Sequence, residues 1–210
     1  MLITNRDAEE LASFRGSFRP AFELVFATAK ERGYEPSGRF GKTTPSIIAK
    51  LRREKTRLTS MQDIAGLPIV VDDVQAQNMA VTNLQKALRE LASCRVYDRR
   101  ANPKFGYRAV HLVFHVDKCP VEVQVRTKLQ HYWAELSEKL ADVDPEIKYG
   151  GGLPNSKELL ERAARMIRNV EEGPPSQLPE AARKELEKAV VDGMAELVES
   201  LEEFKRRRGF

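Results

Sequence analysis

Three polar side chains alternate with three valines along residues 120–126, PVEVQVR. In a β-strand this spacing places Glu122, Gln124 and Arg126 on one face and the valines on the other. A carboxylate can bind a metal or take a proton, an amide can hydrogen-bond a nucleobase, and a guanidinium can hold a phosphate. Plain solvent exposure of one sheet face would give the same pattern, so both interpretations stay open here.

Two neighbouring segments carry further reactive side chains. Asp63 lies just before a predicted strand, where it could cap a turn or pair with Glu122 on an adjacent strand. Two carboxylates at bridging range would bind Mg²⁺, which prefers oxygen ligands and substrate phosphates. Tyr107 follows a glycine at the mouth of another strand, as a base-stacking platform or a rim residue. His111 is either a ligand contact or an interior histidine with a satisfied hydrogen bond.

The positive charge of the chain is concentrated. The whole sequence has 35 basic and 31 acidic residues, a net charge of +4. Residues 30–60 contain nine basic and three acidic residues, and residues 95–108 contain five and one. A third basic cluster is the tail 205–208. Solvated helix faces explain an isolated cluster, but two clusters around an acidic pair predict an anionic partner, most simply phosphates. No Walker A motif is present.

The elements that must position these residues can be predicted from periodicity. We expect helices at 7–32 (interrupted at Pro20), 44–55 (with Thr44 as N-cap), 73–91, 128–141, 156–171 and 180–206. Strands are expected at 67–71, 94–98, 107–116 and 120–126, the last two forming a hairpin. The predicted fold is α+β: a mixed sheet flanked by helices, as residues 1–150, with a helical appendage at 151–210.

Composition excludes several classes of protein. No apolar run approaches the 18 residues of a membrane-spanning helix, so no membrane partner is expected. The first ten residues are polar and acidic, unlike a secretory signal. Cys94 and Cys119 form no motif, which argues against a disulfide framework or zinc site and favours a reduced, cytoplasmic protein.

The order of these motifs resembles the synthetase domain of RelA/SpoT-type alarmone synthetases, in the small single-domain form. The matching stretches are the basic segment 38–53, QDIAG at 62–66, GYRAVH at 106–111, and EVQVRT at 122–127 with Trp133 following. The resemblance covers about residues 30–150. It implies a nucleotidyltransferase-like fold and transfer of the β,γ-pyrophosphate of ATP to a ribose 3′-hydroxyl.

The resemblance also assigns roles to individual residues. Asp63 and Glu122 would be catalytic and would bind Mg²⁺, with Glu122 helping to deprotonate the attacking hydroxyl. Tyr107 would stack on the acceptor base, near His111, Gln124 and Arg126. The residues implied for ATP binding are Arg39, Lys42, Ser46, Lys50, Arg53, Arg99, Arg100 and Lys104.

Two positions depart from the family pattern. The ATP loop usually places its Arg two residues before the Lys, whereas Phe40 and Gly41 separate Arg39 from Lys42 here. Pro68 stands where the family usually has Arg, in the pattern Asp-x-x-Gly-x-Arg. Proline supplies neither a charge nor an N–H donor, so we expect Pro68 to weaken activity unless Arg52, Arg99 or Arg100 supplies the missing charge.

The acceptor is the open part of the functional prediction. The segment 133–152 looks more like the toxic, toxin–antitoxin members of the family, and the chain is basic, which favours the 3′ CCA end of tRNA and a block of translation. The alternatives are GDP or GTP as acceptor in a stringent response, an adenosine nucleotide, and a degenerate RNA-binding module without catalysis. An antitoxin protein or a second copy of the chain could cover the apolar stripes of the C-terminal helices.

Overall fold

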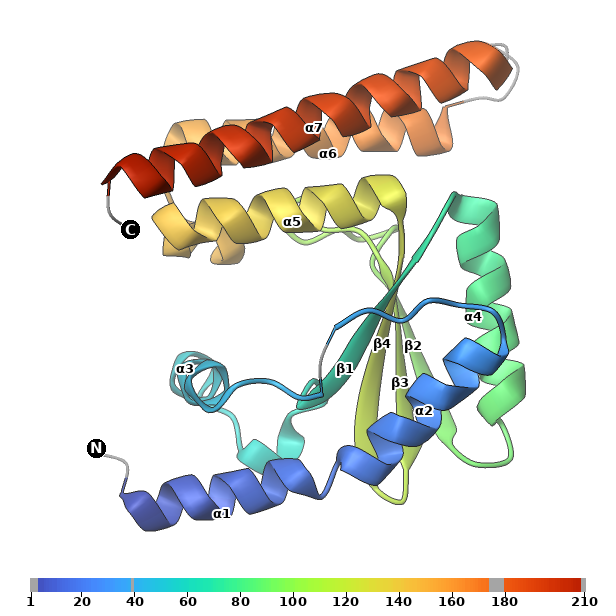
Figure 1. Cartoon of the computed structure of the whole chain (residues 1–210), viewed down its shortest axis with the longest axis vertical. Coiled ribbons are helices and arrows are strands. Elements are labelled where there is room, and N and C mark those ends of the chain that lie inside the picture. The colour runs from blue at the N-terminus through green and yellow to red at the C-terminus, as the bar shows by residue number, and fades with distance from the viewer. Residues whose placement is uncertain (1–3, 39, 174–179, 209–210) are drawn as a thin grey trace. The chain divides into compact units, whose positions relative to one another are not determined.

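The computed structural model describes residues 4–38, 40–173 and 180–208, and it confirms the predicted α+β fold (Figure 1). Seven α-helices, two short 3₁₀ helices and four strands are present among these residues. In chain order they are α1 (Asn5–Gly16), α2 (Arg19–Glu31), α3 (Thr44–Glu54), η1 (Leu58–Ser60), β1 (Ala65–Val71), α4 (Val74–Leu88), β2 (Ser93–Asp98), β3 (Val110–Val116), β4 (Cys119–Thr127), α5 (Lys128–Val143), η2 (Pro145–Tyr149), α6 (Pro154–Glu172) and α7 (Glu180–Arg208).

The strands form one sheet in the order β1-β4-β3-β2. The predicted hairpin is confirmed: β3 and β4 pair antiparallel, with Val116 opposite Cys119. The two residues between them, Asp117 and Lys118, both have positive φ, as a tight two-residue hairpin turn requires. The alternation predicted for β4 is also present, because its valines are fully buried while Glu122, Gln124 and Arg126 are partly exposed.

Proline marks the start of two N-terminal helices. Pro20 lies in the first turn of α2, which explains why the predicted helix 7–32 is divided there. Helix α3 also has a proline in its first turn, but its N-cap is Thr43 rather than the predicted Thr44. The Thr43 side chain accepts a hydrogen bond from the backbone N–H of Ser46 at 3.4 Å, so the cap lies one residue earlier than the proline suggested.

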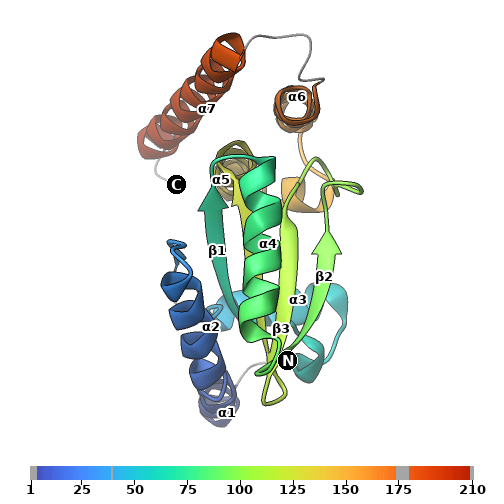
Figure 2. The same cartoon turned by 90° about the vertical axis from the view of Figure 1, so that its right-hand side faces the viewer.

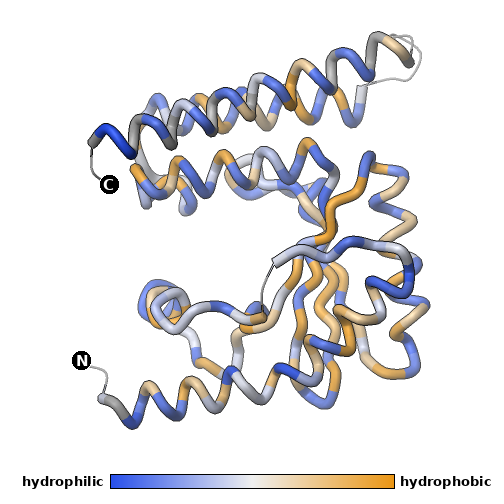
Figure 3. Tube along the Cα trace, in the orientation of Figure 1, coloured by the Kyte–Doolittle hydropathy of each residue, from blue (hydrophilic) through white to orange (hydrophobic). Residues whose placement is uncertain are grey.

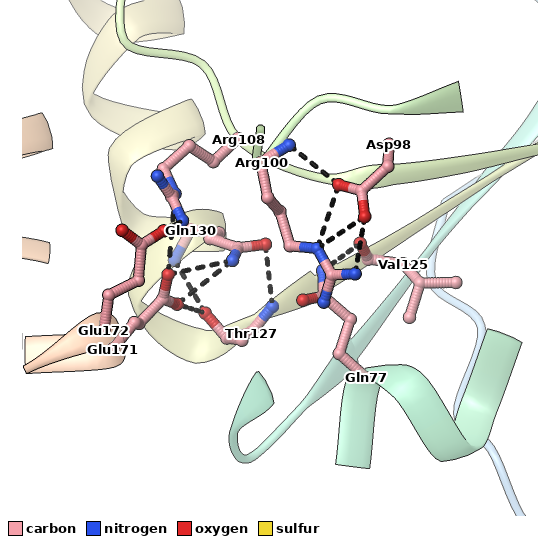
Figure 4. Close-up of polar contacts among 9 residues, drawn as sticks. All are labelled: Gln77, Asp98, Arg100, Arg108, Val125, Thr127, Gln130, Glu171 and Glu172. Atoms are coloured by element: carbon pink, nitrogen blue, oxygen red, sulfur yellow. Dashed lines mark hydrogen bonds and ion pairs between the residues drawn. The ribbon is translucent and has the colours of Figure 1, made fainter. Parts of the chain in front are cut away.

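Helix α4 covers one face of the sheet, and α3 lies on the opposite side (Figures 1 and 2). The apolar residues of the strands make the sheet the most hydrophobic part of this region of the chain (Figure 3). Gln77 is the exception on the buried face of α4: it is fully buried, and its side-chain amide donates to the carbonyl oxygen of Val125 at 2.8 Å (Figure 4). This bond ties α4 to the central strand β4.

Helices α5, α6 and α7 pack against one another around a separate apolar core. Trp133 of α5 is buried in it, and its indole N–H donates to the carbonyl oxygen of Leu160 of α6 at 2.9 Å. The core residues of α6 recur at positions i, i+3, i+4, i+7 and i+10, which is the pattern of one helix face. They are Leu160, Ala163, Ala164, Ile167 and Val170.

The chain divides into two compact units by its internal contacts. The first unit comprises the described residues up to 70, with 75–97 and 110–125. The second comprises 71–74, 98–109 and the described residues from 126 onward. Among the residues that the structure describes, no helix is both long enough and apolar enough to cross a membrane.

Replacing Gln77 tests its hydrogen bond to β4. Gln77→Met keeps the buried volume but leaves the Val125 carbonyl without its donor, so we expect a loss of about 1–3 kcal/mol in the free energy of unfolding. Urea denaturation measures this change. Gln75→Met, on the exposed side of the same helix, is the matched control. An equal loss in both variants would contradict the assigned role.

Candidate active site

Asp63 is held by two lysines in the first unit. Its Oδ2 lies 2.8 Å from Lys42 Nζ and 2.9 Å from Lys50 Nζ. Lys50 comes from α3, whereas Lys42 comes from the loop before it. The backbone N–H of Lys42 also donates to the carbonyl oxygen of Ile64 at 2.8 Å, which fixes the loop beside the segment that enters β1. Two predicted ATP-binding residues and one predicted metal ligand therefore meet at one carboxylate.

The two ammonium groups keep Asp63 ionised. Burial raises the pKa of Asp63, but the hydrogen bonds and positive charges of Lys42 and Lys50 outweigh it, and the net pKa lies below its usual 3.8. The second carboxylate oxygen, Oδ1, is buried and has no hydrogen-bond partner. A buried acceptor left without a partner is costly, so this oxygen has an unused capacity to accept a further contact.

Glu122 is engaged on both of its oxygens by neighbours on the same sheet. His111 Nδ1 lies 2.8 Å from Oε1, and Gln124 Nε2 donates to Oε2 at 2.8 Å. The hairpin register places His111 directly opposite Gln124, so pairing of β3 with β4 assembles the group. His111 thus has a satisfied hydrogen bond, as one of the two interpretations of its sequence position expected, and it lies beside a predicted catalytic residue.

The two predicted catalytic carboxylates influence each other. Burial and the nearby Asp63 charge raise the pKa of Glu122, but contacts with His111 and Gln124 outweigh both, so the net pKa lies below its usual 4.5. Strands β1 and β4 are adjacent. A side chain at Gly66 of β1 would meet the backbone oxygen of Glu122 at 3.1 Å. A glycine therefore fits with less crowding than any other residue where the chain leaving Asp63 passes Glu122.

The carboxylate pair fits a divalent cation whose other ligands come from a substrate. No group of three or more acidic, histidine or cysteine side chains that could hold a metal is found among the described residues. Magnesium sites commonly use only one or two carboxylates, with substrate phosphates and water completing the shell. The unpartnered Asp63 Oδ1 and the neighbouring Glu122 match such a donor set.

The remaining predicted ATP-binding residues are distributed more widely. Ser46 and Arg53 lie on α3, where the Ser46 hydroxyl is 2.9 Å from that of Thr43 and Arg53 is ion-paired with Glu54. Arg39 lies outside the described residues. Arg99, Arg100 and Lys104 belong to the second unit, where Asp98 binds Arg100 through several hydrogen bonds and an ion pair at 2.6 Å (Figure 4).

Tyr107 and Arg126 form a pair in the second unit. An Arg126 N–H donates to the Tyr107 hydroxyl at 3.0 Å, and the guanidinium carbon lies 5.3 Å from the centre of the Tyr107 ring. They border a cavity of about 370 Å³, which we call the Tyr107 pocket. It is lined by Tyr107, Arg126, His131, Trp133, Ala134, Glu135, Ser137, Glu138 and Lys139.

A tight turn presents Tyr107. The expected strand 107–116 begins only at Val110, because Lys104 and Tyr107 close a turn through a backbone hydrogen bond of 2.9 Å. Both central residues, Phe105 and Gly106, have positive φ. A phenylalanine in this conformation is an outlier. Its ring lies against Gly150 so closely that a side chain there would not fit, which supplies the tertiary contact that holds the turn.

His131 lines the Tyr107 pocket but is not among the predicted site residues. Burial lowers the pKa of His131, the Arg126 charge lowers it further, and Glu135 at 3.6 Å partly compensates. Its Nδ1 is buried without a hydrogen-bond partner. The signal was present in the sequence: His131 and Glu135 are four residues apart on the helix that follows the polar strand, and therefore share one helix face.

Neither cysteine takes part in these groups. Cys94 and Cys119 are free thiols, as expected. Burial raises the pKa of Cys94 to about 11, so this thiol is protonated at neutral pH and is not a nucleophile.

Comparison with known proteins gives a consistent result. A family model described as the region found in RelA / SpoT proteins matches residues 38–141, about half of the chain. An uncharacterized protein of Mycobacterium tuberculosis is 33% identical over 143 residues, which are 66% of this chain and 47% of that protein. GTP pyrophosphokinase YjbM of Bacillus subtilis is 33% identical over 150 residues, covering 62% of this chain and 65% of YjbM.

Solved structures agree with the sequence relatives. Small alarmone synthetase 1 of Bacillus subtilis bound to its product pppGpp is similar with a TM-score of 0.64 and 27% identity, over 78% of this chain and 94% of that one. Small alarmone synthetase 2 of the same organism, at 22% identity and a TM-score of 0.60, shares the fold.

The fold is therefore that of the small alarmone synthetases, a nucleotidyltransferase-like α+β architecture. The chain belongs to the RelA/SpoT family. It spans about half the length of the first curated relatives that it matches.

The ionised state of Asp63 predicts a pH-dependent contribution to stability. Because the folded pKa lies below the usual 3.8, the contribution of Asp63 is fully present above about pH 5 and is lost as the pH falls through the folded value. The difference in unfolding free energy between wild type and Asp63→Asn should therefore shrink on acidification. Urea titrations between pH 7 and pH 3 measure it.

Asp192→Asn removes an exposed carboxylate on α7 and is the control. A wild-type advantage over Asp63→Asn that stays constant down to the lowest pH would contradict the lysine-bound state of Asp63.

Proposed function

We propose that this chain is an ATP-dependent pyrophosphokinase that transfers the β,γ-pyrophosphate of ATP to a ribose 3′-hydroxyl. The observation that carries the proposal is the pairing of Lys42 and Lys50 with Asp63, beside the Glu122 group on the adjacent strand. Cations next to two ionised carboxylates are the parts that phosphoryl-type transfer needs, because its catalysis is mostly positioning and neutralisation of charge. Family membership and the GTP pyrophosphokinase relatives support the same reaction.

In the proposed donor site, Lys42 and Lys50 exchange their ionic contacts with Asp63 for contacts with the phosphates of ATP. Without nucleotide, Lys42 and Lys50 are neutralised by Asp63. When ATP binds, these ammonium groups turn to its phosphates, with Ser46, Arg53 and Arg39 as further contacts. Mg²⁺ held by Asp63 and Glu122 would supply Lewis-acid neutralisation of the phosphate charge. Arg99, Arg100 and Lys104 are proposed as additional cations for the ATP phosphates.

The proposed reaction forms one phosphorus–oxygen bond and breaks another. The acceptor 3′-oxygen forms a bond to the β-phosphorus of ATP, and the bond from that phosphorus to the bridging oxygen of the α-phosphate breaks. The electron pair stays with AMP, the leaving group. Glu122 accepts the hydroxyl proton, which requires an ionised carboxylate, and its lowered pKa provides one. His111 and Gln124 orient that carboxylate through their hydrogen bonds.

The acceptor base is proposed to stack on Tyr107, with Arg126 as its neighbour in the Tyr107 pocket. Two classes of acceptor have support. The named relatives, and the pppGpp bound to small alarmone synthetase 1, favour GDP or GTP. The basic segment 30–60 and the basic character of the chain favour the 3′ end of tRNA, because such surfaces bind nucleic acid through its phosphates.

Label transfer decides between these acceptors. Protein with Mg²⁺ and ATP labelled in its terminal phosphates is offered GDP, GTP, AMP, ADP or deacylated tRNA in turn. We expect one class of acceptor to gain label. Asp63→Asn and Glu122→Gln should each reduce product by about a hundredfold or more, because each removes a group that acts in the transition state.

Glu90→Gln, an exposed carboxylate after α4, is the matched control and should keep wild-type turnover. Salt-sensitive RNA binding that survives in Asp63→Asn, with product lost, supports the enzyme. Absence of labelled product from wild type with every acceptor would instead favour a non-catalytic RNA-binding module.

Replacing Pro68 tests the proposed function through a gain of turnover rather than a loss. Pro68 lies on β1, at the edge of the sheet, where a missing N–H is tolerated. Its ring is 3.4 Å from where a Cβ on Gly38 would stand, at the start of the basic loop. Pro68→Arg adds a cation beside this loop, so we expect turnover to rise on the order of tenfold. Initial rates of label transfer measure the gain.

Pro68→Ala removes the ring without adding charge and separates the two effects. If Pro68→Arg folds normally and turns over at the wild-type rate, no cation is missing at this position.

A further inference from the structure

The second unit contains a buried ion pair that none of the proposed substrate contacts uses. The side chains of Arg108 and Glu171 are only 5% and 4% exposed. Arg108 Nε lies 3.7 Å from Glu171 Oε2, and the same guanidinium forms an ion pair with Glu172, which is half exposed. Charged side chains are rarely so deeply buried, and a hydrophobic pair often gives equal stability. The ion pair therefore calls for a role beyond stability.

Glu171 collects donors from two further residues (Figure 4). Its Oε1 accepts from the Thr127 hydroxyl at 2.5 Å and from Gln130 Nε2 at 3.1 Å, and Oε2 accepts from the same Gln130 nitrogen at 3.0 Å. Thr127 is the N-cap of α5 and Gln130 completes its capping box. One carboxylate near the end of α6 thus secures the start of α5 and the residue after Tyr107.

The same face of α6 also contacts Trp133, which lines the Tyr107 pocket, and Gly106, which belongs to the turn before Tyr107. The carbonyl oxygen of Leu160 accepts from the Trp133 indole. Ala164 lies against Gly106, where an added Cβ would come within 2.9 Å of the alanine Cβ. Leu160, Ala164 and Glu171 are separated by four and seven residues, so they form a single stripe along the helix. This stripe therefore contacts Trp133, the turn before Tyr107 and the start of α5.

The residues that Glu171 holds are the direct chain neighbours of the Tyr107–Arg126 pair. Arg108 follows Tyr107, and Thr127 follows Arg126. Fixing Arg108 and Thr127 therefore limits how far the Tyr107 ring and the Arg126 guanidinium can move apart. The Arg126 and Tyr107 side chains are joined directly by their hydrogen bond of 3.0 Å.

We propose that Glu171 is a positioning residue for the acceptor and that α6 is part of the acceptor-binding machinery. This inference rests on the proposed function, because it takes the Tyr107 pocket as the place where the acceptor binds. Glu171 touches no substrate in this scheme. It acts through Arg108, Thr127 and Gln130. The core of the proposed donor site belongs to the other unit, namely Lys42, Lys50, Asp63 and Glu122.

The test compares Glu171→Gln with Glu161→Gln. The first keeps the shape of the side chain and one acceptor oxygen for Thr127, but removes the buried charge beside Arg108 and leaves Arg108 only its ion pair with Glu172. The second changes an exposed glutamate on the same helix. We expect Glu171→Gln to raise the KM for the acceptor about tenfold or more, as small displacements of positioning groups do, with the KM for ATP within about twofold of wild type.

Hydrogen exchange of the ligand-free protein provides a readout that needs no substrate. Exchange should rise in peptides covering 104–109 and 126–131 of Glu171→Gln, with β1, β3 and β4 up to residue 125 unchanged. Glu161→Gln should match wild type in both measurements. Unchanged exchange in these two peptides, or locally raised exchange with an unchanged acceptor KM, would overturn the proposal.

Label transfer by wild type tests the proposed function independently of the role of Glu171. If wild type transfers no label to any acceptor, the enzymatic proposal fails on that result alone. Intrinsic fluorescence of Trp133, the only tryptophan, then reports binding of GDP and of deacylated tRNA at the Tyr107 pocket. Weaker binding to Glu171→Gln than to Glu161→Gln supports a positioning role, and equal or absent binding to all three proteins overturns it.

Discussion

Strand β4 can bury its three valines only by presenting Glu122, Gln124 and Arg126 on its other face, and most of the candidate site follows from that constraint. Because β4 lies between β1 and β3, its polar face meets Asp63 from one side and His111 from the other. The strand ends at Thr127, which caps the next helix. One nine-residue segment thus joins the apolar core, the carboxylate group and the start of α5.

In the first unit, acidic side chains hold two lysines in place. Lys42 and Lys50 share one carboxylate oxygen of Asp63, and Lys50 Nζ also lies 3.9 Å from a carboxylate oxygen of Glu54. Both ammonium groups are therefore fixed beside carboxylates. The second unit uses charge differently, because Arg108 and Glu171 are buried and serve to hold neighbouring residues.

Much of the fold was predictable because it depends on local patterns. Alternation in β4, the hairpin turn and the break at Pro20 each follow from a few adjacent residues. The same patterns misplaced the N-cap of α3 by one residue, since Thr43 and Thr44 are both good caps and only geometry selects Thr43. Motif order also placed Asp63 in one predicted site with Lys42 and Lys50, and the structure brings these lysines to its carboxylate although they are 21 and 13 residues away. The contacts of Glu171 span 41 to 63 residues and follow no motif, so only the folded chain could reveal them.

The conformation of Phe105 has a consequence for the order in which the protein folds. A turn with two positive φ angles favours Asn-Gly, and phenylalanine opposes it locally. The chain preference at this turn therefore opposes the conformation that presents Tyr107, and the packing of the Phe105 ring against Gly150, some 45 residues later in the sequence, offsets that cost. We expect the turn to become stable only once the residues after α5 have packed against it.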